Sequence, residues 1–92
     1  MDDLPKLWAS IRADLYRACN LLPGSSEDSA GLRQCHEFIE HNELELACYA
    51  LEESAKDRAV SSDFWLALRD AAQKMRLGDS SARYEKLAQM GL

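Results

Sequence analysis

The sequence predicts an all-α fold, a single compact bundle of four helices with a short fifth helix at the C-terminus. Apolar residues recur at steps of three and four along most of the chain, which is the spacing of one helical face. No segment has the strict alternation of a half-buried strand, and no Asn-Gly or Asp-Gly pair marks a hairpin turn. A chain of 92 residues is too short for two hydrophobic cores, so residues 1–92 are expected to form one helical domain.

The first helix is expected from about Asp3 to Leu22. Pro5 fits its first turn, where a backbone N–H has no partner inside the helix. The run Pro23-Gly24-Ser25-Ser26 predicts the loop that follows. One face of this helix carries its apolar residues, which are Leu4, Leu7, Trp8, Ile11, Leu15, Ala18 and Leu22.

The second helix is expected to begin between Ser26 and Ser29 and to end near His41 or Asn42. Asn42 and Glu45 resemble a capping box, which predicts a third helix that runs to about Asp57. The apolar positions of the second helix are Leu32, Cys35, Phe38 and Ile39. The residues of the third helix that are expected to face the core are Leu44, Ala47, Cys48, Leu51 and Ala55.

Ser61 or Ser62 is expected to cap the fourth helix, whose apolar stripe is Phe64, Leu68, Ala71, Ala72 and Met75. Leu77-Gly78 predicts its end, with Gly78 in the left-handed conformation. A short last helix would start at Asp79, Ser80 or Ser81 and bury Tyr84, Leu87 and Met90. Paired helical hairpins of the tetratricopeptide kind are an alternative, but no signature repeats at a fixed period.

The charge of the chain limits the classes of partner. Sixteen acidic and eleven basic residues give a net charge of −5, and the Arg and Lys residues are scattered singly. A surface of this sign repels phosphate backbones and attracts basic proteins, although it also serves solubility alone. The N-terminus carries acids where a secretory signal carries positive charge, and no stretch approaches the roughly 18 apolar residues of a membrane span. The sequence therefore predicts a cytoplasmic protein that binds neither nucleic acid nor membrane.

Catalytic and metal-binding patterns are missing. Cys19, Cys35 and Cys48 form no Cys-x-x-Cys pair and lie on or beside apolar stripes, so they are expected to be buried reduced thiols. His36 and His41 are five positions apart, one more than the zinc-protease helix motif requires. No enzyme activity, metal or cofactor is predicted. The alternative in this class is a small metal- or thiol-dependent enzyme that would use Cys35, His36, His41 and Cys48.

The acidity of the chain is concentrated between Glu37 and Asp57, where seven acidic residues accompany a single base, Lys56. An inward-facing stripe on the third helix places Leu46 and Tyr49 on its opposite side, among carboxylates. An exposed apolar anchor with a charged rim is the composition of a protein-binding patch. The alternative is a third helix packed on two sides, with Leu46 and Tyr49 inside. The predicted partner-binding residues are Glu37, Glu40, Glu43, Glu45, Leu46, Tyr49, Glu53 and Asp57.

The run Phe38-Ile39-Glu40-His41-Asn42-Glu43-Leu44-Glu45-Leu46-Ala47, continued by Ala50-Leu51-Glu52, resembles the pattern of MafI-type immunity proteins of bacteria. The later Phe64-Trp65-x-x-Leu68, with Ala71-Ala72 and Met75, is similar to the following helix of such proteins. The resemblance covers roughly residues 30–78 and leaves out the helix with Trp8 and Tyr16.

The resemblance implies a cytoplasmic inhibitor that binds the toxic domain of a polymorphic or contact-dependent growth inhibition toxin. Many such toxins are nucleases with basic substrate surfaces, which an acidic helix would occupy. The contact residues of the family vary with the toxin, so none is transferred to this chain. We therefore expect an immunity protein, monomeric or homodimeric, and keep as the alternative a helical adaptor or regulatory subunit that binds a peptide or a basic protein.

Overall fold

The computed structural model describes residues 4–22, 30–56 and 60–90, with only the backbone described for residues 30–32. Five helices follow one another, α1 (Leu4–Leu21), α2 (Ala30–Glu40), α3 (Leu44–Ala55), α4 (Ser62–Lys74) and α5 (Gly78–Met90). No strand occurs in these ranges, and the Cα radius of gyration is 12.5 Å, so the prediction of a compact all-α fold is confirmed.

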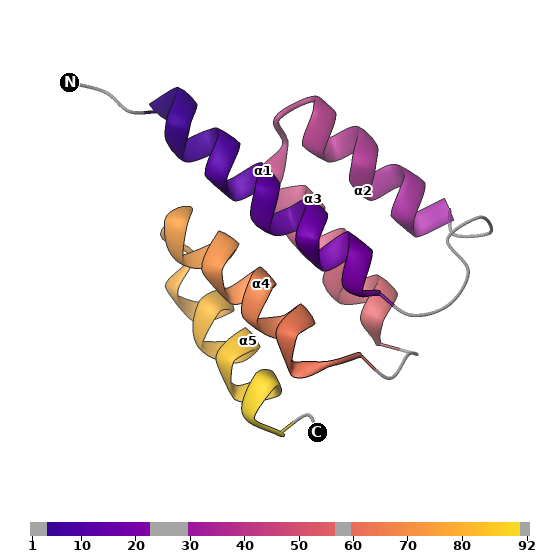
Figure 1. Cartoon of the computed structure of the whole chain (residues 1–92), viewed down its shortest axis with the longest axis vertical. Helices are drawn as coiled ribbons and strands as arrows, with labels where there is room; N and C mark the ends of the chain where they lie inside the picture. Colours follow the sequence, from indigo (N-terminus) through magenta and orange to yellow (C-terminus); the bar gives the residue numbers. More distant parts are fainter. Residues whose placement is uncertain (1–3, 23–29, 57–59, 91–92) are drawn as a thin grey trace.

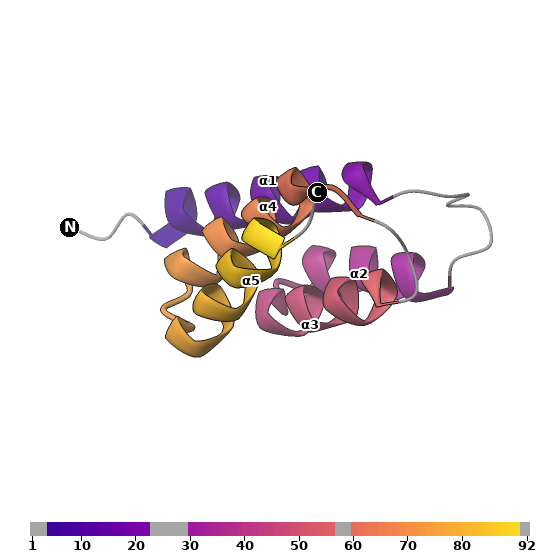
Figure 2. The ribbon, with the colours of Figure 1, turned by 90° about the horizontal axis from the view of Figure 1, so that it is seen from below.

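The helices divide into a group of three and a pair, rather than into four with one added (Figure 1). α4 packs against α1 on one side and α5 on the other, while α2 pairs mainly with α3. Figure 2 shows the α2–α3 pair at a level below α1 and α4. α5 has 13 residues, against 11 in α2 and 12 in α3, so the prediction of a short fifth helix is wrong.

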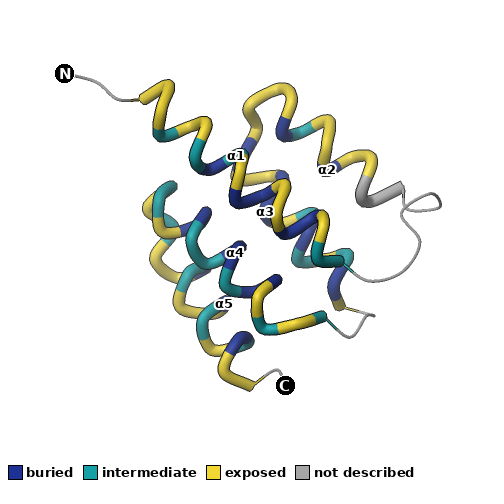
Figure 3. The backbone as a smooth tube through the Cα atoms, in the orientation of Figure 1, coloured by how far each residue is buried: buried dark blue, intermediate teal, exposed yellow. Residues whose placement is uncertain are grey.

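One hydrophobic core includes side chains from all five helices (Figure 3). The predicted stripe of α3 is confirmed, because Leu44, Ala47, Cys48, Leu51 and Ala55 are all buried. Trp65 is also buried, between Phe64 and Tyr84, with which its ring makes an edge and a stacked contact. The largest fully buried side chains are Tyr84, Phe64, Ile11, Leu15, Ile39, Leu51 and Leu68.

The apolar face of α1 is buried in the middle of the helix but exposed at the N-terminal end. Ile11, Leu15 and Ala18 are buried as predicted, but Leu4 and Trp8 are 44% and 40% exposed. In Figure 1 the first turn of α1 extends beyond the other described helices, in agreement with the exposure of these two side chains. The prediction that Met90 is buried is wrong as well, since this last residue of α5 is 67% exposed.

Asn42 ends α2 instead of capping α3. Its φ is 60°, and the N–H groups of Glu43 and Asn42 donate to the carbonyl oxygens of Phe38 (2.7 Å) and Ile39 (3.0 Å). These two bonds form a Schellman motif, in which Asn is tolerated because its short side chain suits left-handed backbone. The residue that precedes α3 is Glu43, whose side chain makes no capping bond, so the predicted capping box is wrong.

A second Schellman motif ends α4, and its left-handed residue is Arg76 rather than Gly78. Arg76 has a φ of 61°, and the N–H groups of Leu77 and Arg76 donate to the carbonyl oxygens of Ala72 (2.8 Å) and Gln73 (3.0 Å). Gly78 already belongs to α5. The predicted cap at the start of α4 is confirmed, because the Ser61 side chain accepts a hydrogen bond from the Phe64 N–H at 3.4 Å.

Replacing Arg76 with Gly is expected to stabilise the protein. Left-handed backbone costs an L-residue about 1–2 kcal/mol, and the larger entropy loss of Gly on folding offsets part of this gain. The free energy of unfolding in urea should therefore rise by about 0.5–1 kcal/mol. Gly78→Ala is the matched test, because a Cβ there meets nothing within 4 Å and helical Ala is favoured over Gly by about 1 kcal/mol. If both substitutions stabilise the protein, they confirm that Arg76 is the left-handed residue. Destabilisation by Gly78→Ala would indicate that Gly78 is the left-handed residue instead.

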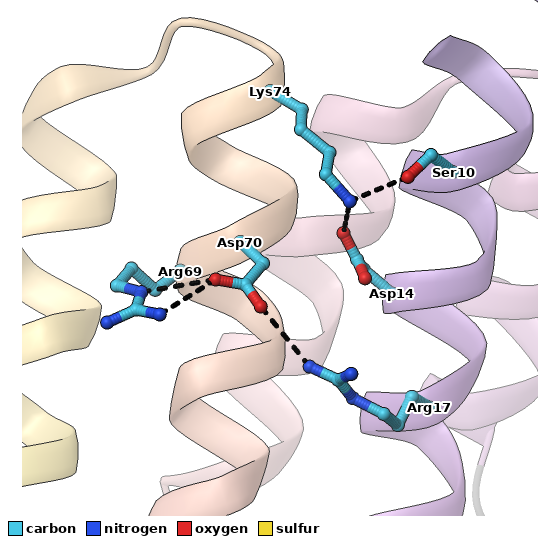
Figure 4. A network of polar contacts seen from close by, with 6 residues as sticks. All are labelled: Ser10, Asp14, Arg17, Arg69, Asp70 and Lys74. Atoms are coloured by element: carbon cyan, nitrogen blue, oxygen red, sulfur yellow. Dashed lines mark hydrogen bonds and ion pairs between the residues drawn. The ribbon is translucent and has the colours of Figure 1, made fainter. Parts of the chain in front are cut away.

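Polar side chains tie α1 to α4 (Figure 4). Lys74 donates to the carboxylate of Asp14 at 2.7 Å and to the hydroxyl of Ser10 at 2.6 Å. Asp14 is a buried residue, and only 11% of its side chain is exposed. Further along, Asp70 accepts from Arg69 at 2.9 Å and from Arg17 of α1 at 3.4 Å, nearer the surface.

We expect Asp14→Asn to destabilise the fold more than Asp70→Asn. The first change leaves a partly buried ammonium without its carboxylate, which costs about 1–3 kcal/mol. The second removes pairs that are more open to water, which contribute about 0–1 kcal/mol. Urea unfolding of both variants and of Lys74→Met, alone and combined with Asp14→Asn, measures the coupling. Additive effects of Asp14→Asn and Lys74→Met would contradict a direct ion pair.

Candidate protein-binding surface

The outer face of α3, defined here as Glu45, Leu46, Tyr49 and Glu53, is exposed as the sequence predicts. Leu46 and Tyr49 are 47% and 37% exposed, while the stripe on the opposite side of the helix is buried. Steps of three and four residues join these positions, so they share one side of the helix. The alternative in which α3 is packed on two sides with Leu46 and Tyr49 inside is therefore wrong.

Two side-chain contacts, within α3 and with its C-cap residue, involve the carboxylates of this face. The Tyr49 hydroxyl donates to the Glu45 carboxylate at 3.0 Å, one turn earlier. Lys56 lies 2.7 Å from the Glu53 carboxylate in an exposed pair, and pairs of this kind contribute little to stability. Both carboxylates therefore stay on the surface beside a large apolar side chain.

A groove opens where the start of α3 meets the start of α1. Its volume is about 590 Å³, and Lys74 and Met75 from the end of α4 close it. We call it the α1–α3 groove. Trp8 stands on the α1 side and Leu46 on the α3 side, so the structure joins part of the outer face of α3 to an exposed aromatic residue. Its lining residues are Leu7, Trp8, Ile11, Asn42, Glu43, Leu44, Glu45, Leu46, Lys74 and Met75.

Sequence reasoning missed Trp8, because it assigned this residue to the buried stripe of the first helix. A signal was present in the pair Leu7-Trp8. Adjacent residues on a helix are about 100° apart, so two large neighbours cannot both point to the middle of one narrow core. Ile11 and Leu15 occupy the buried middle, Leu7 is half-buried, and Trp8 lies outside.

The charge around the α1–α3 groove is negative. Lys74 is the basic residue among its lining residues, and its ammonium is engaged by Asp14 and Ser10. The carboxylates of Glu43 and Glu45 form no ion pair with any residue in the described part of the chain. Arg12, which donates to the lining residue Asn42 at 2.8 Å, offsets part of this charge. An apolar groove with a net negative rim suits a partner that is apolar and positively charged.

The other predicted acids do not join this surface. Glu40 lies near Tyr16 of α1, where burial and the Glu40 carboxylate together raise the pKa of the phenol. Tyr16 is two helical turns beyond Trp8, which is about 12 Å along α1, and Glu40 is not among the residues that line the groove. Glu37 is exposed on the side of α2 opposite the buried Cys35 and Ile39. Asp57 lies outside the described residues.

Glu52, the remaining acid of the segment, has an internal role. It accepts two hydrogen bonds from Arg83 of α5, at 2.8 and 2.9 Å, and one from the Tyr84 hydroxyl at 2.9 Å. Burial acts to raise the pKa of Glu52, but the bonds from Arg83 and Tyr84 outweigh it and lower the pKa. This carboxylate is therefore a link between α3 and α5 and is not offered to a partner.

The cysteines are buried and the histidines are exposed, so these side chains do not share one environment. All three thiols are free and buried, as predicted, with Sγ atoms of Cys19 and Cys35 3.8 Å apart. His36 is exposed and packs edge-on against the Tyr16 ring at 5.5 Å, and His41 is also exposed. In the described ranges no group of three or more His, Cys, Asp or Glu side chains is arranged to hold a metal ion.

The described helices include none that combines the length and the apolar content of a membrane span. Comparisons with protein-family models, curated proteins and solved structures find no match for this chain. The resemblance of residues 30–78 to MafI-type immunity proteins therefore stays a prediction.

Alkaline pH is expected to destabilise the fold through Cys48. Burial raises the pKa of this thiol from 9.0 to about 11, so the unfolded chain loses the proton first. The protonated Cys48 thiol therefore makes its full contribution to stability below pH 9, and this contribution is lost as the pH rises to about 11. Relative to Cys48→Ala, the wild-type free energy of unfolding should fall by about 1–3 kcal/mol across this interval, measured in urea with a reductant. Parallel pH profiles of the two proteins would contradict this assignment.

Proposed function

We propose that this protein is a binding protein whose partner is a basic protein domain, and that the outer face of α3 and the α1–α3 groove make the contact. The observation that supports the proposal is the exposure of Leu46 and Tyr49 beside the carboxylates of Glu43 and Glu45. The described part of the chain offers no basic side chain that pairs with either carboxylate.

The apolar and acidic parts of this surface would do different work in a complex. Removing apolar area from water contributes about 25 cal/mol per Å², so covering Leu46, Tyr49 and Trp8 supplies affinity. The carboxylates speed the encounter with a positive surface and orient the partner, and their effect weakens as salt is added. The proposed association is therefore fast and salt-dependent, with the apolar residues setting its lifetime.

Within this class, the resemblance of residues 30–78 favours an immunity protein that neutralises a cognate toxin domain in the cytoplasm. A nuclease toxin binds a polyanionic substrate through a basic surface. An acidic helix that covers such a surface competes with the substrate directly. The proposed mode of action is occupation of the toxin's substrate surface, without a chemical reaction by this protein.

The test is a mixture of the purified chain with the toxin domain encoded next to its gene. Complex formation is followed by calorimetry, and protection of the toxin's substrate is followed by gel. Glu45→Lys combined with Glu53→Lys should weaken binding at least about tenfold, which is about 1.4 kcal/mol. Each exposed substitution of this kind shifts folding stability by about 0.5 kcal/mol, so the pair should lose about 1 kcal/mol and still give a cooperative thermal melt.

Glu37→Lys combined with Glu40→Lys is the matched control, since it changes the net charge equally on α2. Equal weakening by the two pairs would assign the effect to net charge and contradict a localised surface. Failure of the wild-type chain to bind any neighbouring toxin domain would contradict the immunity role and favour the alternative of an adaptor for another basic protein. An adaptor would bind its partner without inhibiting an activity.

A further inference from the structure

We infer that the α1–α3 groove is the seat for one amphipathic, lysine- or arginine-bearing helix of the partner. This inference rests on the proposed binding function and adds which element of the partner is recognised and where. The inference is supported by the shape of the groove, the exposed apolar residues beyond it and the sign of the charge at its rim.

The groove has the size and lining of a recognition site. Its volume of about 590 Å³ lies within the range of about 300–1,000 Å³ that is usual for binding pockets. Six of its ten lining residues are apolar, and among them Trp8 and Leu46 are exposed large side chains on opposite walls. Trp and Leu at these positions offer an occupant two apolar surfaces to pack between.

Apolar surface continues past the groove along both helices, so the occupant is larger than a single side chain. Leu4, one turn before Trp8, is 44% exposed, and Tyr49, one turn after Leu46, is 37% exposed. Because α1 and α3 run in the same direction, Leu4 and Tyr49 extend this surface at opposite ends of the groove. A surface of this length suits a helix whose own apolar residues repeat at three or four positions. An amphipathic helix meets this requirement with its narrow apolar stripe.

The rim determines the charge of that helix. Glu43 and Glu45 bring two negative charges to the groove, while Lys74 is neutralised by Asp14 at 2.7 Å. The Arg12 guanidinium, which donates to the lining residue Asn42 at 2.8 Å, brings one positive charge to the edge. The N-terminal dipole of α3 adds about half a positive charge, so the two carboxylates still exceed the positive charge at the rim, by a small margin. A second copy of this chain would bring its own acidic rim against the first, which disfavours self-association through the groove.

The experiment uses the full chain and two synthetic, amidated peptides of about 16 residues, long enough for partial helicity. Both are Ala-based with Leu residues one turn apart, and the residues that flank this stripe are Lys in one peptide and Glu in the other. We expect the Lys peptide to bind at least about tenfold more tightly than the Glu peptide. Amide shifts in NMR spectra should concentrate at the start of α1, the start of α3 and the end of α4.

The variants Leu46→Lys and Met90→Lys separate the groove from general surface effects. Both replace an exposed apolar side chain with a positive charge, but Met90 is at the far end of α5 and does not line the groove. Leu46→Lys should weaken Lys-peptide binding at least about tenfold, and Met90→Lys should leave it unchanged. Thermal melts of both variants check that the fold is retained, and Glu45→Gln gives a smaller loss by removing one rim charge.

Several outcomes would overturn the inference. These are no binding of the Lys peptide at millimolar concentration, equal binding of the Glu peptide, amide shifts outside the groove, or a dimer that Leu46→Lys dissolves. The proposed function has a separate readout in the toxin-domain assay. If the toxin domain binds Leu46→Lys as well as the wild type but loses affinity for the Glu45→Lys and Glu53→Lys pair, the groove inference fails while the proposed function stands. If the Lys peptide binds at the groove but the toxin domain does not bind the protein, the groove inference stands and the proposed immunity role fails.

Discussion

The placement of α4 between α1 and α5 is the constraint on which the rest of the structure depends. Its Phe64, Trp65, Ala67, Leu68, Ala71 and Ala72 are all buried, so this helix is covered over a broad sector and needs a neighbour on each side. The inward face of α1 is used for one side, and the Asp14–Lys74 pair ties the two helices together. α3 is left with α2 as its main partner and with few contacts to α1 and α4. Its outer face is free for that reason.

The sequence predicts those parts of the fold that follow from periodicity within one helix. The stripe of α3 has a regular spacing of apolar residues, so both its buried side and the exposure of Leu46 and Tyr49 could be inferred. For Trp8 the sequence indicates only that Leu7 and Trp8 compete for the buried side of α1. Which of the two is exposed depends on where α4 ends, and the repeat of α1 does not contain that information. Arg76 was missed because Gly is the usual left-handed residue. The hydrogen bonds that end α4 place the left-handed residue two positions before Gly78.

Proximity along the chain was a poor guide to which acids share a surface. Glu52 turns toward α5, where it pairs with Arg83 and accepts a hydrogen bond from Tyr84, 31 and 32 positions away in sequence. Glu40 faces the side of α2 that meets Tyr16, and only Glu43 and Glu45 reach the groove. A helix distributes consecutive acids around its axis, so a charged segment divides among several environments. Which acid meets which arginine is decided by tertiary packing, which composition does not report.

The Arg12–Asn42 hydrogen bond has a consequence for recognition. Arg12 of α1 donates to the Asn42 side chain at 2.8 Å, and Asn42 also supplies the left-handed backbone from which the chain enters α3. The same residue thus links the two walls that an incoming helix would touch. In the proposed complex, this contact would restrain the spacing of the walls before docking and so reduce the conformational entropy lost. Pre-organisation of this kind lets a small contact area yield a usable affinity.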